Sequence, residues 1–265
     1  MQATPVKEAA TALGLDVLTP ERVRDVENML RERNVRLFAV ASYGKILPQS
    51  LLDIPALGAF NVHPSLLPLY RGATPLQAQI RDMVAETGVT IIAMDAGMDT
   101  GDVLVQERTP LGPRETYGEL EARLANLGAE LLVRAIEENQ AGAAHHIRQE
   151  TLAPPEAIAA TLTHPLRGAD LQIDWTKSAA GVDAFVRSLA PQPMARATIA
   201  GTACKVLEVH PIALESNETP GATVRIPRGI AVACGSGAVA VDRVVPASRN
   251  LMSGEAFAAS LFART

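Results

Sequence analysis

In residues 1–143 of this 265-residue chain, short apolar runs alternate with amphipathic stretches. The apolar runs are typical of buried strands, and they are VRLFAVASYG, Leu57–Val62 and GVTIIAMD. A further run, DVLVQERT, is the expected hairpin partner of GVTIIAMD. The spacing of apolar residues elsewhere predicts helices at Pro5–Leu13, Glu21–Arg33, 74–83 and 116–139. This alternation predicts an α/β fold with a doubly wound, mostly parallel sheet.

The sequence changes character after Gly168. One amphipathic helix is expected in SAAGVDAFVRSL, several short strand-like runs follow it, and a closing helix is expected at 253–262. Short strands at this spacing predict a small antiparallel β-barrel. The intervening stretch is rich in Ala, His, Pro and Thr and is interpreted as a linker, whose His145 and His146 are better explained as solvated residues than as a metal site. The predicted division is a catalytic domain at 1–143, a linker at 144–167 and a barrel domain at 168–265.

Composition narrows the possible functions. The formal net charge of −5 argues against a globally basic nucleic-acid-binding protein, although a local basic patch remains open. Cys204 and Cys234 lie in strand-like runs, and we expect buried free thiols in a reducing compartment. The sequence lacks an apolar run of the length that a membrane span needs, about 20 residues. Lys7 and Glu8 stand where a signal peptide would be apolar, so we expect a cytoplasmic protein.

Polar side chains gather after two of the predicted strands. Asn61 and His63 follow one strand, and the stretch MDAGMDTGD places Asp95, Asp99 and Asp102 among glycines after another. Ligands on α/β sheets bind at such carboxyl ends. An Asn can donate to a developing oxyanion, a His can move protons near neutral pH, and an Asp can orient the imidazole and stabilise its cation. Without a Ser or Cys nucleophile, this set suits transfer between two bound substrates, in which an acceptor amine attacks directly.

Each of these features has a simpler explanation when it is taken alone. A single His is more often a hydrogen-bonded structural residue than a catalyst. The glycine-rich acidic stretch could bind calcium, but it lacks the closing Glu of an EF-hand loop. We therefore expect no metal.

Two motifs together resemble a known family. The stretch NVHPSLLPLYRGATP, followed by ETGVTIIAMDAGMDTGDVL, resembles the formyltransferases that use 10-formyltetrahydrofolate. The stretches TPVKEAATALGLDVLTP and ASYGKILPQSLLDIP match as well, and IDWTKSAAGVDAFVRSLAPQPMARATIAGTACKVLEVH is similar to the second domain of methionyl-tRNA formyltransferases. The resemblance implies a Rossmann-like formyltransferase sheet with a small OB-like barrel. It also implies formyl transfer from 10-formyltetrahydrofolate to the α-amino group of methionyl initiator tRNA, in translation initiation.

The resemblance also assigns roles to residues. Asn61, His63 and Asp99 take the catalytic places, with Asn61 and a protonated His63 stabilising the formyl oxygen while Asp99 tunes the imidazole. The residues that fall where the family holds tetrahydrofolate are Ser65, Leu66, Leu67 and Pro68. The residues that would line the pterin pocket are Lys45, Ile46 and Leu47 and the loop Asp95–Gly101, with Asp95 and Gly97.

The sequence departs from the family in two places. Members of the family have a strand, a helix and a second strand before the segment that TPVKEAA matches, so we expect a free strand edge and an exposed apolar face. Three explanations are considered: a mis-assigned or shortened start, a fragment completed by another chain, and a decayed copy. We favour the first, and with the segment restored we expect a monomer.

The family's charged stretch before IDW is replaced by LTHPLRGAD. Candidates for contacts with tRNA phosphates, against a solvated-surface alternative, are Lys177, Arg187, Arg196, Lys205 and Arg225.

Two other functions remain open. One is formyl transfer to a smaller amine, such as an amino sugar nucleotide or glycinamide ribonucleotide. The other is a non-catalytic remnant that binds folate or tRNA.

Overall fold

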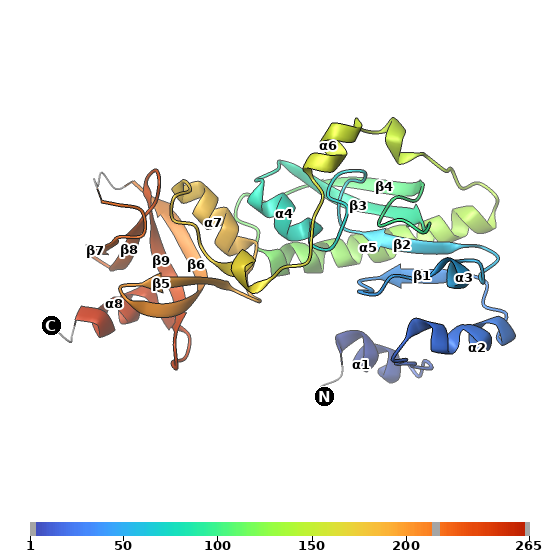
Figure 1. Cartoon of the computed structure of the whole chain (residues 1–265), viewed down its shortest axis with the longest axis horizontal. Coiled ribbons are helices and arrows are strands. Elements are labelled where there is room, and N and C mark those ends of the chain that lie inside the picture. Colours follow the sequence, from blue (N-terminus) through green and yellow to red (C-terminus); the bar gives the residue numbers. More distant parts are fainter. Residues whose placement is uncertain (1–3, 214–217, 263–265) are drawn as a thin grey trace.

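A computed structural model describes residues 4–213 and 218–262 of the chain. The described residues form two domains that lie side by side along the long axis of the molecule (Figure 1). The N-terminal domain is built on a four-stranded sheet, and the C-terminal domain on a six-stranded one. Within these residues, no helix is both long enough and apolar enough to cross a bilayer.

The sheet of the N-terminal domain has the strand order β1-β2-β3-β4. Its strands are β1 (Phe38–Ala41), β2 (Ala59–His63), β3 (Glu86–Ala93) and β4 (Val103–Pro110). β1 and β2 are parallel, whereas β3 is antiparallel to both β2 and β4. The predicted α/β fold is confirmed, but its mostly parallel character applies only to β1 and β2.

The connections explain why the sheet is mixed. The chain leaves β2 through a long loop and enters β3 after α4 (Pro75–Arg81), a helix of 7 residues. Such a helix is about 10 Å long, and it does not act as the crossover helix that usually joins parallel strands. The segment 94–102 then returns the chain directly into β4, as the predicted hairpin requires.

The longest helix, α5 (Tyr117–Gln140), packs against β2, β3 and β4. Thr116 begins it with a capping box, because the Thr116 hydroxyl accepts from the amide of Glu119 while the Glu119 carboxylate accepts from the amide of Thr116. Its buried residues recur every three or four positions: Leu120, Leu124, Gly128, Leu131 and Ala135. Gly128 is required by close packing, since a Cβ there would lie 2.6 Å from Val62 Cγ1.

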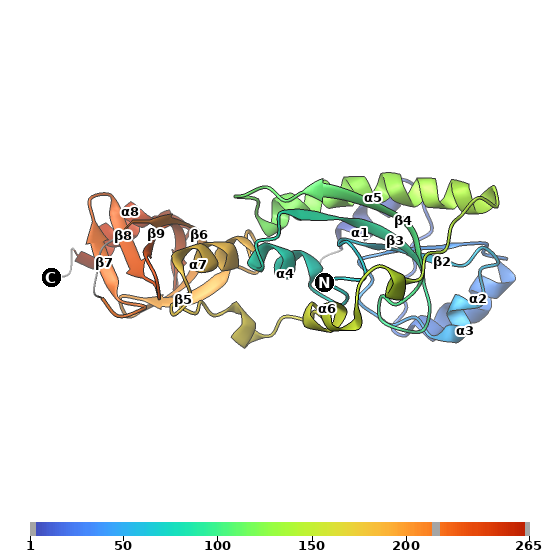
Figure 2. The same cartoon turned by 90° about the horizontal axis from the view of Figure 1, so that it is seen from above.

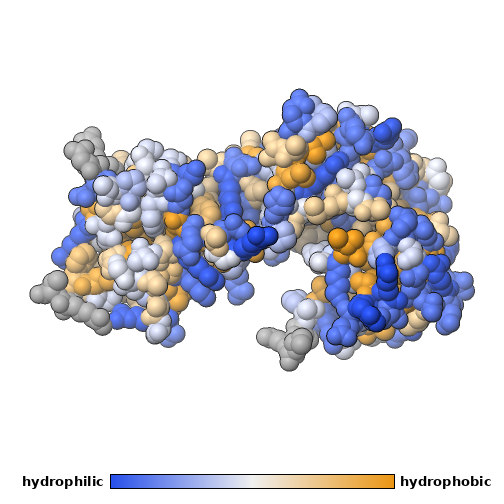
Figure 3. Space-filling view, in the orientation of Figure 1, coloured by the Kyte–Doolittle hydropathy of each residue, from blue (hydrophilic) through white to orange (hydrophobic). Residues whose placement is uncertain are grey.

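The helices before β2 are short. They are α1 (Pro5–Ala12), η1 (Val23–Val26), α2 (Glu27–Glu32) and α3 (Gln49–Leu52). The helix predicted at Glu21–Arg33 is therefore a 3₁₀ turn followed by a short α-helix, and neither has a buried residue to hold it as one rod. Large apolar side chains are exposed in this part of the chain, and apolar surface is visible on this domain in Figure 3. They include Val6, Leu13, Leu15, Tyr43 and Ile46.

The C-terminal domain begins with α7 (Ala179–Arg187) and continues into strands that pair in antiparallel fashion, as predicted. The strand order is β5-β6-β9-β8-β7, with β10 beside β9. The elements are β5 (Ala195–Ile199), β6 (Thr202–Ile212), β7 (Thr223–Ile226), β8 (Gly229–Ala233), β9 (Ala238–Pro246), β10 (Met252–Ser253) and α8 (Gly254–Phe262). Register shifts in β6 near Glu208 bend the sheet around its core. In the described part of the chain the strand pairings run from β5 to β7 without closing into a ring.

Cys204 and Cys234 are buried free thiols in this domain, as expected. Burial raises the pKa of Cys204 to about 11, which keeps its thiol protonated near neutral pH. These residues belong to the core of the domain, packed with the apolar faces of α7 and the strands.

The segment between the domains follows the surface of the N-terminal domain. It contains η2 (Gln149–Thr151) and α6 (Pro155–Ala160), and it ends at η3 (Gly168–Leu171), whose Leu171 belongs to the core of the C-terminal domain. In Figure 2, α6 lies on the side of β2–β4 opposite to α5. Most of its side chains are exposed, but Gln149 and Thr163 are buried. The backbone of Ile147 also pairs with that of Val103, and Thr161 Oγ1 accepts from the amide of Tyr70, so the segment is attached to the domain at several points.

Candidate active site

Asn61 and His63 lie at the carboxyl end of β2, an inner strand of the sheet. Because side chains alternate along a strand, these two residues project from the same face while Val62 projects to the other, toward α5. Asp99 comes from the segment that joins β3 to β4, with a backbone φ of +56°. The structure brings together the three residues to which the sequence assigns catalysis.

The imidazole of His63 is buried, with 4% of its surface exposed, and it has a backbone partner. Its Nε2 lies 2.9 Å from the carbonyl oxygen of Tyr70, and its Nδ1 lies 3.6 Å from Asp99 Oδ1. Since a carbonyl only accepts hydrogen bonds, Nε2 carries a proton. Nδ1 is therefore the ring nitrogen that gains or loses the second proton, and it faces Asp99.

The carboxylate of Asp99 links the loop after β2 to the strand itself. Oδ2 accepts a hydrogen bond from the amide of Gly72 at 2.8 Å, and Oδ1 accepts from Asn61 Nδ2 at 3.5 Å. The second bond is long, so the Asn61 amide has a weak hold on Asp99. An amide in that state can turn toward a stronger acceptor.

The environment of His63 lowers the pKa of its imidazole. Burial is the largest cause, because it penalises the cation; Asp99 opposes it by favouring the cation, and Arg71 adds to the lowering. The neutral imidazole is therefore the favoured form near neutral pH. This differs from the protonated His63 that the sequence analysis expects.

The loop Ser65–Pro68, where the resemblance places tetrahydrofolate, is shaped by internal hydrogen bonds. The Ser65 hydroxyl donates to the carbonyl of Leu69 at 2.7 Å, and the amide of Leu67 donates to Thr90 Oγ1 at 3.1 Å. Ser65, Leu67 and Pro68 are buried, and Leu66 is half-buried. Three of these four side chains thus serve the shape of the loop, and only Leu66 has substantial exposed surface.

The other predicted pocket residues lie on two loops. Lys45 Nζ donates to the carbonyls of Pro20 and Glu21 at 3.4 and 2.8 Å, while Ile46 is 89% exposed and Leu47 is half-buried. On the second loop, the exposed Asp95 accepts from the amide of Gly97 and from the hydroxyl of Thr100. These bonds shape each loop, but among the described residues no hydrogen bond joins the two loops to each other.

Three residues that hold the site are missing from the sequence-based set. Gln149 bonds both to Arg71 and to the backbone of Asp99, Thr163 bonds to the backbone of Arg71, and Gln106 bonds to the carbonyl of Leu67. The Arg71 guanidinium donates to Gln149 Oε1 through both Nε and Nη2. Gln149 and Thr163 lie in an irregular segment without a periodic signal, and Gln106 is a single polar residue of β4, so only the fold reveals these contacts.

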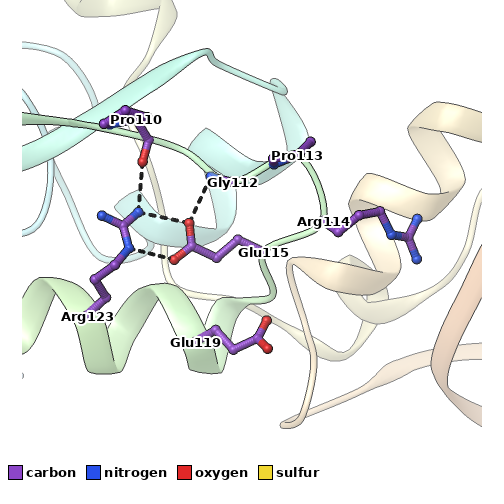
Figure 4. Close-up of a pocket in the computed structure, with 7 residues that line it drawn as sticks. All are labelled: Pro110, Gly112, Pro113, Arg114, Glu115, Glu119 and Arg123. Carbon is purple, nitrogen blue, oxygen red and sulfur yellow. Dashed lines mark hydrogen bonds and ion pairs between the residues drawn. The ribbon is translucent and has the colours of Figure 1, made fainter.

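A hollow of about 640 Å³ lies at the junction of the domains rather than at Asn61 and His63 (Figure 4). Arg123 makes two bonds of 2.8 Å to the carboxylate of Glu115, which also accepts from the amide of Gly112 at 3.0 Å. Arg114 points away from this pair in Figure 4, toward the C-terminal domain. The charged groups of the hollow have partners within the protein, since Arg123 pairs with Glu115, Glu119 accepts from Thr116, and Arg114 pairs with Asp183. Such pairing is typical of a structural junction.

One of the predicted tRNA contacts is wrong. Arg187 is buried at this junction, where it bonds to Asp183 Oδ2 at 2.9 Å and to the carbonyl of Glu115 at 3.0 Å. It is therefore not available to a phosphate. The other four candidates are exposed: Lys177, Arg196, Lys205 and Arg225.

Within the described residues, no three His, Cys, Asp or Glu side chains come together as a metal site. The exposed His146 instead lies 3.7 Å from Asp102. The candidate site brings together an amide, an imidazole and one carboxylate.

Comparisons with known proteins agree with this arrangement. Residues 2–136 match the family model described as formyl transferase, and residues 165–261 match the model described as formyl transferase, C-terminal domain. The methionyl-tRNA formyltransferase of Solibacter usitatus (strain Ellin6076) is 40% identical over 258 residues, which are 97% of this chain and 81% of that protein.

Solved structures share the fold at lower identity. HypX from Aquifex aeolicus, in complex with tetrahydrofolic acid, aligns with a TM-score of 0.68 at 16% identity and covers 91% of this chain and 42% of its own. An N-formyltransferase from Helicobacter canadensis, in complex with folinic acid and dTDP-3-aminofucose, aligns with a TM-score of 0.64 at 17% identity and covers 91% of this chain and 81% of its own. The chain is an enzyme of the formyl transferase family and belongs, within it, with the methionyl-tRNA formyltransferases.

Proposed function

We propose that this chain transfers a formyl group from 10-formyltetrahydrofolate to the α-amino group of methionyl initiator tRNA. The observation that carries the proposal is the convergence of Asn61, His63 and Asp99 at the end of β2, in a chain so similar to a methionyl-tRNA formyltransferase. We place the reaction in the cytoplasm, where translation begins.

The residues present fit a folate donor. A pterin ring needs apolar surface, and Ile46 and Met98 expose large apolar side chains on the two loops that the resemblance assigns to it. The loop after β2 is ordered by its own hydrogen bonds, so little ordering remains to be done on binding. The bound donor supplies the formyl group, and the chain supplies the polar groups around it.

Asn61 is the proposed donor to the formyl oxygen. When an amine adds to the formyl carbon, negative charge develops on that oxygen. The Asn61 amide can turn to it because its present bond to Asp99, at 3.5 Å, is weak. An amide placed in this way stabilises the transition state more than the ground state.

His63 is the proposed acceptor of the amine proton. Its Nε2–H is committed to the carbonyl of Tyr70, so the lone pair of the neutral ring is on Nδ1. When Nδ1 takes the proton, the cation faces the Asp99 carboxylate at 3.6 Å, which stabilises it. The Asp99 carboxylate also keeps the loop at Gly72 close to the ring.

The test is a formyl-transfer assay with two acceptors. The purified chain is incubated with labelled 10-formyltetrahydrofolate and either methionyl initiator tRNA or an amino sugar nucleotide. We expect label on the methionyl amine and none on the sugar. Transfer to the sugar alone would reject the proposal, and folate binding without transfer to either acceptor would indicate a binding remnant.

An exposed basic groove supports tRNA as the acceptor. Arg196 on β5 lies directly opposite Lys205 on β6, and Arg249 lines the same groove of about 450 Å³. Like charges opposite each other on a ladder destabilise it unless an anion lies between them. We propose that this groove takes phosphates of the tRNA backbone.

Salt dependence tests the groove. Each cation that contacts a phosphate contributes about one unit to the slope of log affinity against log salt. We expect Arg196→Gln and Lys205→Gln each to weaken tRNA binding and to flatten that slope, whereas Arg108→Gln, at an exposed residue of the other domain, leaves both unchanged. Unchanged slopes in the first two variants would remove the groove from the proposal.

A further inference from the structure

The segment between the domains is anchored to the active site through one buried amide. Gln149 is 1% exposed, although its neighbours Arg148 and Glu150 are exposed. A buried polar side chain costs stability unless its hydrogen bonds are made. Gln149 makes all of the bonds that it can make, and each partner belongs to a loop that carries the candidate active site.

The amide of Gln149 connects two loops. Its Nε2 donates to the carbonyls of Asp99 and Gly101 at 2.8 and 2.7 Å, and its Oε1 accepts from Arg71 Nε and Nη2 at 3.0 and 2.7 Å. Two donors and two acceptor positions are the full complement of a primary amide. A carboxylate in its place would keep Arg71 but would turn an oxygen toward two carbonyls.

These two loops meet over His63. The Asp99 carboxylate accepts from the amide of Gly72, which follows Arg71, and it faces His63 Nδ1. Asp99 has a φ of +56°, a region that costs a residue with a side chain about 1 kcal/mol or more unless its surroundings hold it there. The bond from Gln149 to the carbonyl of Asp99 holds this backbone in place.

Thr163 is a second anchor of the same segment. Its amide and its hydroxyl both donate to the carbonyl of Arg71 at 2.9 Å, and the hydroxyl accepts from the amide of Thr74 at 3.1 Å. The contact is close enough that a Cβ at Gly72 would lie 2.1 Å from the carbonyl oxygen of Thr163. Both anchors therefore act on the loop that supplies the amide partner of Asp99.

We propose that Gln149 and Thr163 are positioning residues that set the distance between the Asp99 carboxylate and the His63 imidazole. The inference rests on the proposed function, because it concerns the proton that His63 takes during transfer. Neither side chain touches His63 or Asn61 in the described structure. They act by fixing the loops at Arg71–Gly72 and Asp99–Gly101.

Two substitutions at Gln149 separate its two roles. Gln149→Met removes both halves of the amide at similar length, and Gln149→Glu keeps only the acceptor for Arg71. A displacement of about 1 Å at a reacting centre costs on the order of 10² in rate. We expect both variants to lose about 10- to 100-fold in kcat for methionyl-tRNA, with KM for the tRNA unchanged.

The matched control is Asn139→Ala, which removes a half-buried amide that donates to the carbonyl of Leu57 at 3.3 Å, away from the site. It should lower thermal stability yet keep kcat. A normal kcat for Gln149→Glu or Gln149→Met would overturn the inference, and so would an equal loss of kcat in Asn139→Ala.

Thr163 keeps the inference testable if the Gln149 variants do not fold. Thr163→Val removes the hydroxyl at constant shape and should lower kcat, whereas Thr163→Ser keeps the hydroxyl and should restore it. Normal kcat in Thr163→Val would overturn the role of this anchor.

Amide exchange at Gly72 provides a readout that needs no catalysis: it should be faster in Gln149→Met and Thr163→Val than in the unchanged protein. If the unchanged protein transfers no formyl group, the proposed function fails, and unchanged exchange at Gly72 would separately refute the positioning.

Discussion

Two side chains at the end of β2 carry the proposed chemistry, and each depends on a weak or unusual contact. Asn61 holds Asp99 by a bond of 3.5 Å, and His63 is oriented by the backbone of Tyr70 rather than by a side chain. The first contact leaves an amide available to a substrate, and the second fixes which ring nitrogen can react. Asn61 and His63 therefore each lead to a prediction that can be measured.

Asn61→Ala should lower kcat about 10²- to 10³-fold, the usual cost of removing one donor to an oxyanion. Asn139→Ala is the control, because its amide donates to the carbonyl of Leu57 away from the site. Rates from single-turnover formyl transfer compare the two variants. A loss below threefold for Asn61→Ala would show that this amide does not contact the reacting oxygen.

The imidazole of His63 should titrate below the usual value for histidine, near 6.5. Burial, the main cause, favours the neutral ring, and Asp99 only partly offsets it. If His63 accepts the amine proton, kcat/KM rises with pH through this lowered pKa and then stays level. NMR titration, with the signal assigned by comparison with His63→Gln, measures the pKa directly. A rate that falls as pH rises through the same value would mean that His63 acts as a cation instead.

At the scale of elements, α5 supports the strand that presents these residues. Gly128 allows the helix to approach β2, and the side chain that it meets is Val62, between Asn61 and His63. The position of the catalytic side chains thus depends on a contact on the opposite face of their own strand.

Gly128→Ala should therefore destabilise the fold by about 1–3 kcal/mol, as overpacking does, despite the better helix propensity of Ala. Activity should fall with it. Val62→Ala combined with Gly128→Ala should recover part of both, because the two residues are in contact. Urea unfolding measures the coupling, and Asn126→Ala, at an exposed position of the same helix, is the control. Additive effects of the two substitutions would contradict the proposed contact.

Local sequence rules predict the order of the helices and strands better than they predict how the strands pair in the sheet. The capping box at Thr116 and the repeat of buried residues in α5 are local, so the helix is found within a residue or two of its prediction. The antiparallel direction of β3 depends on how far the connection through α4 reaches, which the apolar pattern does not encode. Likewise, Asn61 and His63 stand out because they end a strand, whereas Gln149 lies 50 residues from Asp99 in the chain and acquires its partners only in the fold.

At the scale of the whole molecule, a buried ionic group joins the two domains. Asp183 accepts from Arg187 and from Arg114, which also donates to the carbonyl of Val209. Nearby, Arg81 stacks over the ring of Phe185 at 4.6 Å and donates to Ser188. These contacts fix the orientation of the barrel-like domain and its basic groove relative to the active site.

Arg187→Met should destabilise the protein by about 3–5 kcal/mol, because it removes a buried partner of a buried carboxylate. Arg114→Met should cost less, since the Arg114 side chain is half exposed. Urea unfolding of both variants checks the order, and formyl transfer to methionyl-tRNA reports the domain orientation. Equal stability of Arg187→Met and the unchanged protein would show that the junction does not depend on this pair.

The two anchors of the segment between the domains also determine where the chain tolerates change. Helix α6 lies between Gln149 and Thr163, and none of its residues is buried. Extra residues inserted there, or a single cut by a protease, would leave both attachment points in place on either side. This surface helix is thus a suitable site at which a tag or a fluorescent probe can be added without disturbing the loops over His63.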